Sequence, residues 1–257
     1  MTDADPVCPS RIDHHLESVL SDADEAGLSL VREVLHEPGD RWYGQLVVNT
    51  YVSVTDTGDP ETVIPAAAGV ELLRAYVRLR SRLLVTFADK HTHSFTLDPT
   101  SALLAGDYLY SAAFSSLGSV PDTPSSDCFE ILTSVLESIT QAFARAYTPA
   151  GSADCDQAVF LDETAGSLGE GATVLGATLA GLDESNQQYF EQLGQGLSTA
   201  RQIDCILDGI QSEALIVLPE LDESQLQAHT ERRRDDANQA FDVLSETFDV
   251  ASLRNDL

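Results

Sequence analysis

The chain has 257 residues, 43% of them hydrophobic and 7% aromatic, an ordinary composition for a globular protein with a sizeable core. Forty-two Asp and Glu residues against 14 Lys and Arg give a net charge of −28, which would repel nucleic-acid phosphates, so we expect no nucleic-acid partner. The acids are spread along the whole length and Lys90 is the single lysine. This pattern is typical of adaptation to a high-salt cytoplasm; an acidic face for a basic partner is the alternative.

Cysteine usage and apolar runs indicate the compartment. Cys8, Cys128, Cys155 and Cys205 form no Cys-x-x-Cys pair, and no secretory signal is recognisable, so we expect reduced thiols in a cytoplasmic protein. No apolar run approaches the roughly 20 residues of a membrane helix, so we expect no membrane span.

Apolar residues recur at helical spacing along most of the chain. Residues 44–54 are rich in β-branched side chains, but nothing nearby could pair with them as a hairpin, so we predict a buried helix there. Residues 1–10 are polar, contain two prolines, and are expected to be disordered. The predicted helices cover residues 10–35 with a break near Gly27, 44–54, 66–88, 100–117, 128–147, 156–182, 184–208, 211–218 and 224–248.

The pattern predicts an all-α fold, a single bundle of about ten helices that forms one domain over residues 1–257. Three segments stand out within it: 66–76 (AAAGVELLRAY), 101–117 (SALLAGDYLYSAAFSSL) and 163–209, which contains the turn LGATLAG. Together, in this order and at this spacing, they resemble the trans-isoprenyl diphosphate synthase (polyprenyl synthetase) family over residues 39–210. The resemblance implies an isoprenoid synthase-like bundle.

Members of that family condense isopentenyl diphosphate with an allylic diphosphate. Releasing diphosphate requires strong neutralisation of the leaving group, which the family obtains from Mg²⁺ ions held by two Asp-Asp-x-x-Asp motifs on facing helices. Positions i and i+4 share one helix face, so carboxylates at this spacing converge on the same ions. The resemblance therefore implies Mg²⁺ as a cofactor if the chain is active, and no cofactor otherwise.

The first aspartate-rich motif is missing. Counted from Glu71, its three positions fall on Ser81, Arg82 and Val85. No carboxylate lies on this helix between Glu71 and Asp89. One of the two magnesium-binding motifs is therefore absent.

The cations that bind diphosphate in the family have also changed. Of the family's Gly-Lys-Arg-x-Arg-Pro motif only Arg41 matches, and Glu163 replaces the lysine of its Lys-Thr pair. Arg74, Arg78 and Arg82 lie at i, i+4 and i+8, so one helix face is basic. That face either pairs with acids in the fold or at a subunit interface, or forms an anion site. The candidate diphosphate ligands are Arg41, Arg78 and Arg82.

The second motif survives in part. Asp204 and Asp208 keep two carboxylates at i and i+4 and are the candidate metal ligands, whereas Cys205 replaces the middle aspartate. A thiol is a poor ligand for Mg²⁺. The preceding Gln202-Ile203 pair is one residue out of register with the family pattern, which leaves the helical phase of the carboxylates open.

Two further clusters have simpler interpretations. Residues 232–234 are three arginines flanked by acids, which favours ion pairs within one helix. His91 and His93, near Asp89, are either a partial metal site or a solvated loop, and their spacing favours the loop.

The resemblance and these substitutions predict a catalytically degenerate family member, a non-catalytic or regulatory subunit of an active prenyl synthase. Such a subunit would form a homodimer, or a heterodimer with the active synthase, and could bind an isoprenoid or an isoprenyl diphosphate. The alternative is an active Mg²⁺-dependent prenyltransferase in which Asp204 and Asp208 hold a single metal site.

Overall fold

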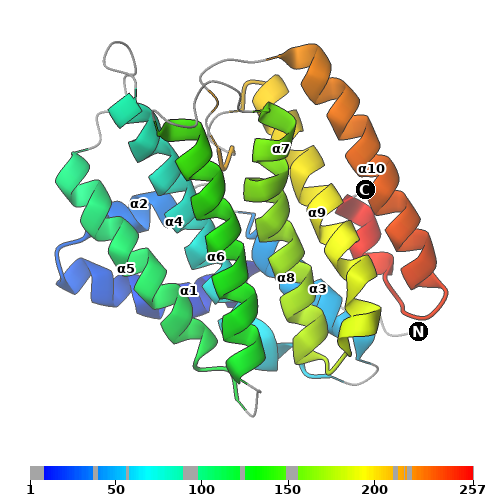
Figure 1. Ribbon diagram of the computed structural model, residues 1–257. Coiled ribbons are helices and arrows are strands. Elements are labelled where there is room, and N and C mark those ends of the chain that lie inside the picture. The colour runs from blue at the N-terminus through cyan, green and yellow to red at the C-terminus, as the bar shows by residue number, and fades with distance from the viewer. Residues whose placement is uncertain are drawn as a thin grey trace.

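The computed structural model describes residues 9–36, 40–55, 58–88, 98–121, 125–148, 156–210, 214–216, 218 and 222–256. These residues form the predicted all-α bundle and contain no β-strand (Figure 1). The elements are α1 (Pro9–Glu25), α2 (Ser29–His36), α3 (Trp42–Val54), the 3₁₀ turn η1 (Pro60–Val63), α4 (Ile64–Ala88), α5 (Pro99–Leu117), α6 (Ser125–Tyr147), α7 (Gln157–Leu161), the π-helical turn η2 (Asp162–Gly166), α8 (Ser167–Leu179), α9 (Glu184–Leu207), α10 (Glu223–Ser245) and the 3₁₀ turn η3 (Ala251–Asp256).

Helices α5, α6, α8, α9 and α10 cross one face of the bundle, and α3 and α4 lie behind them (Figure 1). Helix α4 packs against α5 and α3, while α8 lies between α3, α6 and α9. The interior helix α3 is the predicted one: Leu46, Val47 and Val48 are fully buried, as are Leu72 and Leu73 of α4. The β-branched segment is therefore helical because it is enclosed by other helices and not paired with a strand.

Local sequence signals set several helix ends. The side chains of Asp98 and Asp183 accept hydrogen bonds from backbone N–H groups in the first turns of α5 and α9. Gly27, Gly181 and Gly209 follow α1, α8 and α9 with positive φ, a conformation in which other residues are strained. The break near Gly27 is confirmed.

Helices α8 and α9 approach each other backbone to backbone. A Cβ atom placed on Gly169 would lie 2.3 Å from the carbonyl oxygen of Gly194 and 2.3 Å from Cβ of Ser198. A Cβ on Gly194 would lie 2.3 Å from Oγ1 of Thr173. Two facing glycines are thus what permits this approach.

The predicted helix 211–218 is wrong where the structure describes it, because residues 214–216 and 218 are not helical. Ala214, Leu215 and Ile216 are all buried. Three consecutive side chains point to different sides of a helix, so a surface helix could not bury all three. The predicted helix 156–182 is also interrupted, by the π-turn η2.

Some expectations fall on residues that the structure leaves undescribed. Residues 1–8 are among them, although α1 already begins at Pro9, so the expected disorder does not extend to residue 10. The Asp89, His91 and His93 hypothesis also lies outside the described residues. No described helix combines the length and apolarity that a membrane span requires.

Candidate functional site

The helix that resembles the family's first motif, α4, carries a buried ion pair. Glu71 is fully buried; its Oε1 accepts the backbone N–H of Gly44 at 2.9 Å, and its Oε2 accepts Nε of Arg74 at 2.7 Å. The pair joins α4 to the first turn of α3. Breaking one partner of such a buried pair is strongly destabilising, so Glu71 has a structural role here.

Arg41, one of the three candidate diphosphate ligands, lies just before α3 with a φ of 52° and is 3% exposed. Its Nε donates to Oδ1 of Asp13 at 2.6 Å, and its Nη1 donates to the carbonyl of Leu35 at 2.5 Å. Nη2 of Arg74 approaches the same carbonyl at 3.4 Å. Two cations therefore meet at the C-terminal end of α2, where the helix dipole favours positive charge.

The other two candidates, Arg78 and Arg82, are on α4. Arg78 is fully buried and Arg82 is partly buried. The two further positions that match the first motif, Ser81 and Val85, are buried as well. This helix face offers guanidinium, hydroxyl and alkyl groups where the family has carboxylates.

On α9 the structure resolves the helical phase of the second motif. Gln202 and Cys205 are buried beside Arg74 of α4. Asp204 instead points to α10, where its carboxylate pairs with Arg234. Burial raises the pKa of Asp204, and the charge of Arg234 opposes that shift. Asp208, the residue that ends α9, is exposed.

A small polar cavity separates α3, α4 and α9. Its volume is about 20 Å³, and its walls include Trp42, Tyr43, Arg74, Gln202, Cys205 and Leu215. The backbone N–H of Leu215 donates to Oε1 of Gln202 at 2.8 Å, which turns Nε2 away from Leu215. Nε2 is buried without a hydrogen-bond partner in the described residues. The space suits one water molecule, and a diphosphate is much larger.

Burial raises the pKa of Tyr43 to about 12, and its hydroxyl lies 2.9 Å from Oγ of Ser198. The phenol therefore stays neutral at ordinary pH and acts as a hydrogen-bonding group between α3 and α9.

These residues do not fit the magnesium clamp of the family. Among the described residues, no group of three or more His, Cys, Asp or Glu side chains is placed to hold a metal ion. Cys205 of α9 lines the cavity together with Arg74 of α4, and its thiol is a poor ligand for Mg²⁺. Arg234 already neutralises Asp204. The metal-binding role of Asp204 and Asp208 stays a prediction.

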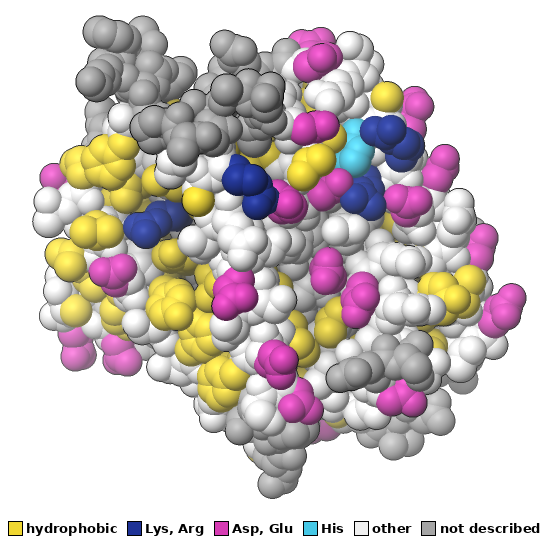
Figure 2. Space-filling view, viewed as in Figure 1, with side chains coloured by type: hydrophobic (Ala, Val, Ile, Leu, Met, Phe, Trp, Pro, Cys, Tyr) yellow, Lys and Arg dark blue, Asp and Glu magenta, His cyan; other side chains and the backbone are white. Residues whose placement is uncertain are grey.

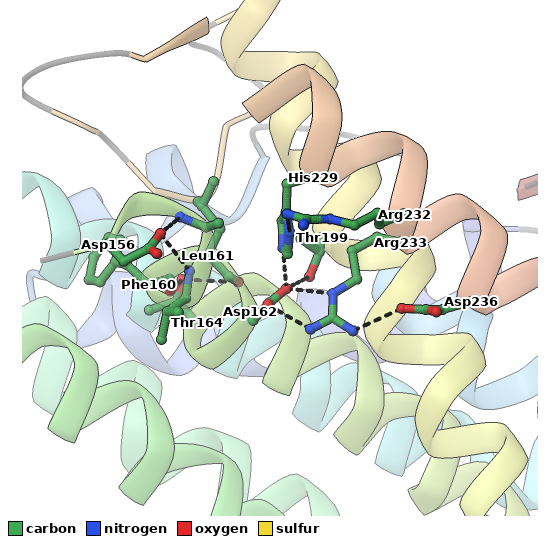
Figure 3. Close-up of polar contacts among 12 residues, drawn as sticks. Asp156, Phe160, Leu161, Asp162, Thr164, Thr199, His229, Arg232, Arg233 and Asp236 are labelled. Atoms are coloured by element: carbon green, nitrogen blue, oxygen red, sulfur yellow. Dashed lines mark hydrogen bonds and ion pairs between the residues drawn. The ribbon is translucent and has the colours of Figure 1, made fainter. Parts of the chain in front are cut away.

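A second polar centre surrounds the π-turn η2 (Figure 3). The carboxylate of Asp162 accepts Nε and Nη2 of Arg233 at 2.8 and 2.6 Å, Nε2 of His229 at 3.0 Å and Oγ1 of Thr199 at 3.2 Å. This one side chain ties η2 to α9 and α10. The chain positions lie far apart, and no local pattern pointed to the cluster.

The histidine in this cluster has a defined tautomer. Nδ1 of His229 lies 3.2 Å from Nη2 of Arg232. A guanidinium can only donate, so Nδ1 accepts and the proton is on Nε2, which donates to Asp162. Arg233 and Arg234 thus bond to other elements, through Asp162 and Asp204, whereas Arg232 contacts His229 of its own helix. Within the described part of the chain, the predicted ion pairing inside one helix is confirmed for Arg233 with Asp236.

An open groove of about 1060 Å³ runs over α8 between α6 and α9, from η2 towards the turn that precedes α9. We call it the acidic groove. None of its lining residues is Lys or Arg, and seven are acidic: Asp127, Glu130, Asp162, Glu163, Glu170, Asp183 and Glu191. Arg233 neutralises Asp162, and Arg145 neutralises Glu163. Neither arginine lines the groove.

Comparison with known proteins identifies relatives of the chain. No protein-family model matches it. The sequence is 26% identical over 208 residues to a short chain isoprenyl diphosphate synthase of Methanocaldococcus jannaschii, a match that covers 77% of the chain and 62% of that relative.

Solved structures share the fold. A geranyltranstransferase from Methanosarcina mazei superposes with a TM-score of 0.72 at 16% identity, over 93% of this chain and 89% of the other. The small subunit of geranyl diphosphate synthase from Antirrhinum majus superposes with a TM-score of 0.70 at 17% identity, over 95% of this chain and 93% of the other. An isoprenoid synthase family member from Thermotoga neapolitana gives 0.69 at 18% identity, over 96% and 97%.

These likenesses show that the protein has the all-α isoprenoid synthase fold. The matched segment of its sequence is similar to a short chain isoprenyl diphosphate synthase, which supports the resemblance to the trans-isoprenyl diphosphate synthases. The resemblance drawn from the sequence is thereby confirmed.

Proposed function

We propose that the chain is a non-catalytic partner subunit of an isoprenyl diphosphate synthase. The observation that carries this proposal is the chemistry of the cavity between α3, α4 and α9. Two guanidinium groups, a thiol, an amide, apolar and aromatic side chains and a single carboxylate, that of Asp40, enclose about 20 Å³. Two aspartate motifs and two diphosphates would need a far larger, carboxylate-lined space.

The energetic reason is the charge of the leaving diphosphate. Removing one preorganised electrostatic group typically lowers a rate by about 10²–10³. Here the positions of the first motif hold Ser81, Arg82 and Val85, and Asp204 is neutralised by Arg234. Even with strong non-additivity, the loss of several groups removes most of the transition-state stabilisation.

An exposed apolar surface supports the subunit part of the proposal. Rings of α4, α5 and α6 form a ladder with centroid separations of 5.9, 5.1 and 5.9 Å, and Leu103 continues it along α5 at helical spacing. Leu103 is 46% exposed and Tyr110 43%. We call this surface the apolar stripe (Tyr76, Leu103, Tyr110, Phe114 and Phe129).

Contiguous apolar surface of this kind is typical of protein–protein contacts. A solved structure with the same fold is named as a small subunit of geranyl diphosphate synthase. The partner proposed here is an active synthase, or a second copy of the chain. Cys128 and Cys205 are buried and form no disulfide with a described residue, which favours a reducing compartment, and the proposal places the protein in the cytoplasm.

In this role Arg41 and the arginines of α4 hold helices together, and Asp204 binds Arg234 in place of a metal. The alternative is an active enzyme with Mg²⁺ on Asp204 and Asp208. Its support is that the two carboxylates, one helical turn apart, are close enough for the charge of Asp208 to raise the pKa of Asp204.

The test is an assay with isopentenyl and allylic diphosphates, Mg²⁺ and molar salt, using the chain alone and mixed with an active synthase. We expect no turnover by the chain alone and an altered product length or rate in the mixture. Turnover by the chain alone that Asp204→Ala abolishes, and that the exposed control Asp242→Ala leaves intact, would establish the active alternative.

A further inference from the structure

The acidic groove is large enough to hold a short helix. Its floor is the recessed helix α8, which presents the small residues Ser167, Gly171 and Thr178, and its walls are α6 and α9. Along α6 the lining runs from Asp127 to Ser138, which corresponds to about 16 Å, or three helical turns. A short helix of another chain can lie lengthwise in such a groove.

Two of the acids that line the groove lack a counter-charge among the described residues. Glu170 projects from the floor and Glu191 from the α9 wall, and neither forms an ion pair with a described residue. Burial is the main cause that raises the pKa of Glu170, and the negative charge of Glu191 raises it further. Two facing carboxylates that are partly removed from water favour a cation between them. Protein cations on a bound helix would meet that requirement.

The groove and the apolar stripe share helix α6. Phe129 of the stripe and Glu130 of the groove are neighbours on it, and Ile131 lines the groove. Figure 2 shows apolar side chains over the side of this face that holds α5 and α6, with acidic side chains beside them over the middle. A partner covering the face would therefore need apolar groups next to basic ones.

We propose that this face, which includes the acidic groove, docks a basic amphipathic helix of a different protein chain, the partner subunit of the function proposed above, on which this inference rests. A second copy of the chain is disfavoured because a two-fold contact through the groove would bring like charges together on a protein of net charge −28. A chain with lysine or arginine opposite Glu170 and Glu191 has the complementary charge.

The test uses a defined probe that requires no synthase. A fluorescein-labelled helical peptide of 14 residues, with lysines on one face and leucines on the other, is titrated with the protein at the lowest salt at which circular dichroism shows it folded. The groove variant is Glu170→Gln/Glu191→Gln. The matched control is Glu231→Gln/Asp235→Asn, which removes the same charge from exposed residues of α10.

We expect the groove variant to weaken peptide binding about tenfold and the control to change it less than about twofold, because contact pairs outweigh distant charges. Equal weakening by both variants would mean attraction by net charge alone and would overturn the proposal. Self-association of the chain, measured by light scattering and abolished by the groove variant, would assign the face to a second copy and also overturn it.

The same variants separate this inference from the subunit function. If the groove variant binds the peptide as well as wild type while the chain still alters the product of an active synthase, the docking site is refuted and the subunit function stands. If peptide binding depends on Glu170 and Glu191 but no synthase is affected, the docking site stands and the function fails.

Discussion

Replacing Gly169 by alanine tests the backbone-to-backbone contact of α8 and α9. The new Cβ would lie 2.3 Å from the carbonyl of Gly194 and 2.3 Å from Cβ of Ser198. Real Cβ atoms essentially never approach other atoms within 3.0 Å, and two of the three close neighbours are a backbone oxygen and a Cβ, which cannot rotate away. The helices must move apart by several tenths of an ångström or more.

The expected magnitude combines two opposing effects. In a helix interior, alanine is favoured over glycine by about 0.5–1 kcal/mol. Overpacking of a close contact costs about 1–3 kcal/mol. The net change for Gly169→Ala should therefore be a loss of unfolding free energy of up to about 2.5 kcal/mol, and at best no gain.

Gly106→Ala provides the matched control, because it is also in a helix but its Cβ would meet only the Tyr76 ring, at 3.8 and 3.9 Å. That variant should gain about 0.5–1 kcal/mol. Urea unfolding at fixed salt, followed by circular dichroism, measures both changes. If Gly169→Ala proved as stable as Gly106→Ala, the close helix contact would be refuted.

Three more predictions concern the site. Glu170→Gln should raise the thermal midpoint at neutral pH. The folded pKa of Glu170 is raised above its usual 4.5, so the stability that this group contributes is present below 4.5 and is lost as the pH rises through the folded pKa. A difference in midpoint between variant and wild type that persists in acid would contradict this. Asp162→Ala should lower the unfolding free energy by about 2–4 kcal/mol, because Arg233 keeps only the exposed Asp236 and His229 loses its partner. Adding Arg233→Ala should then cost little, and additive losses in a double-mutant cycle would argue against the contact. Leu215→Ala should speed the reaction of Cys205 with a thiol reagent severalfold, because Leu215 and Cys205 line the same small cavity and a smaller side chain gives the reagent better access. An unchanged rate would mean that Leu215 does not cover the thiol.

The sequence was sufficient for the architecture because helical periodicity is local. Residues 44–54 were recognised as a buried helix despite their β-branched content, and the break at Gly27 followed from one residue type. The family emerged from three segments whose order and spacing survive in the chain. These signals need no knowledge of tertiary contacts.

The site was less accessible, since its contacts join distant parts of the chain. Asp162 is 67 residues from His229 and 71 from Arg233, and each looks like an ordinary surface residue in isolation. The phase of Asp204 could not be decided either, because the deciding partner, Arg234, is 30 residues away on α10. The sequence predicts a helix at Leu215 because a short buried segment without regular structure has the same apolar composition as a helix.

The π-turn η2 has a consequence for insertions and deletions. A π-turn carries one residue more than a regular helical turn, so deleting one residue from Asp162–Gly166 could leave a continuous helix from α7 into α8. The extra residue is held as a bulge, so its removal would leave α8 in nearly the same phase around the axis. Gly169 would still face α9, and Glu170 would still line the acidic groove. The turn η2 can thus lose one residue without rotating the groove floor, whereas the same deletion inside the regular helix α9 would rotate everything after it by about 100°.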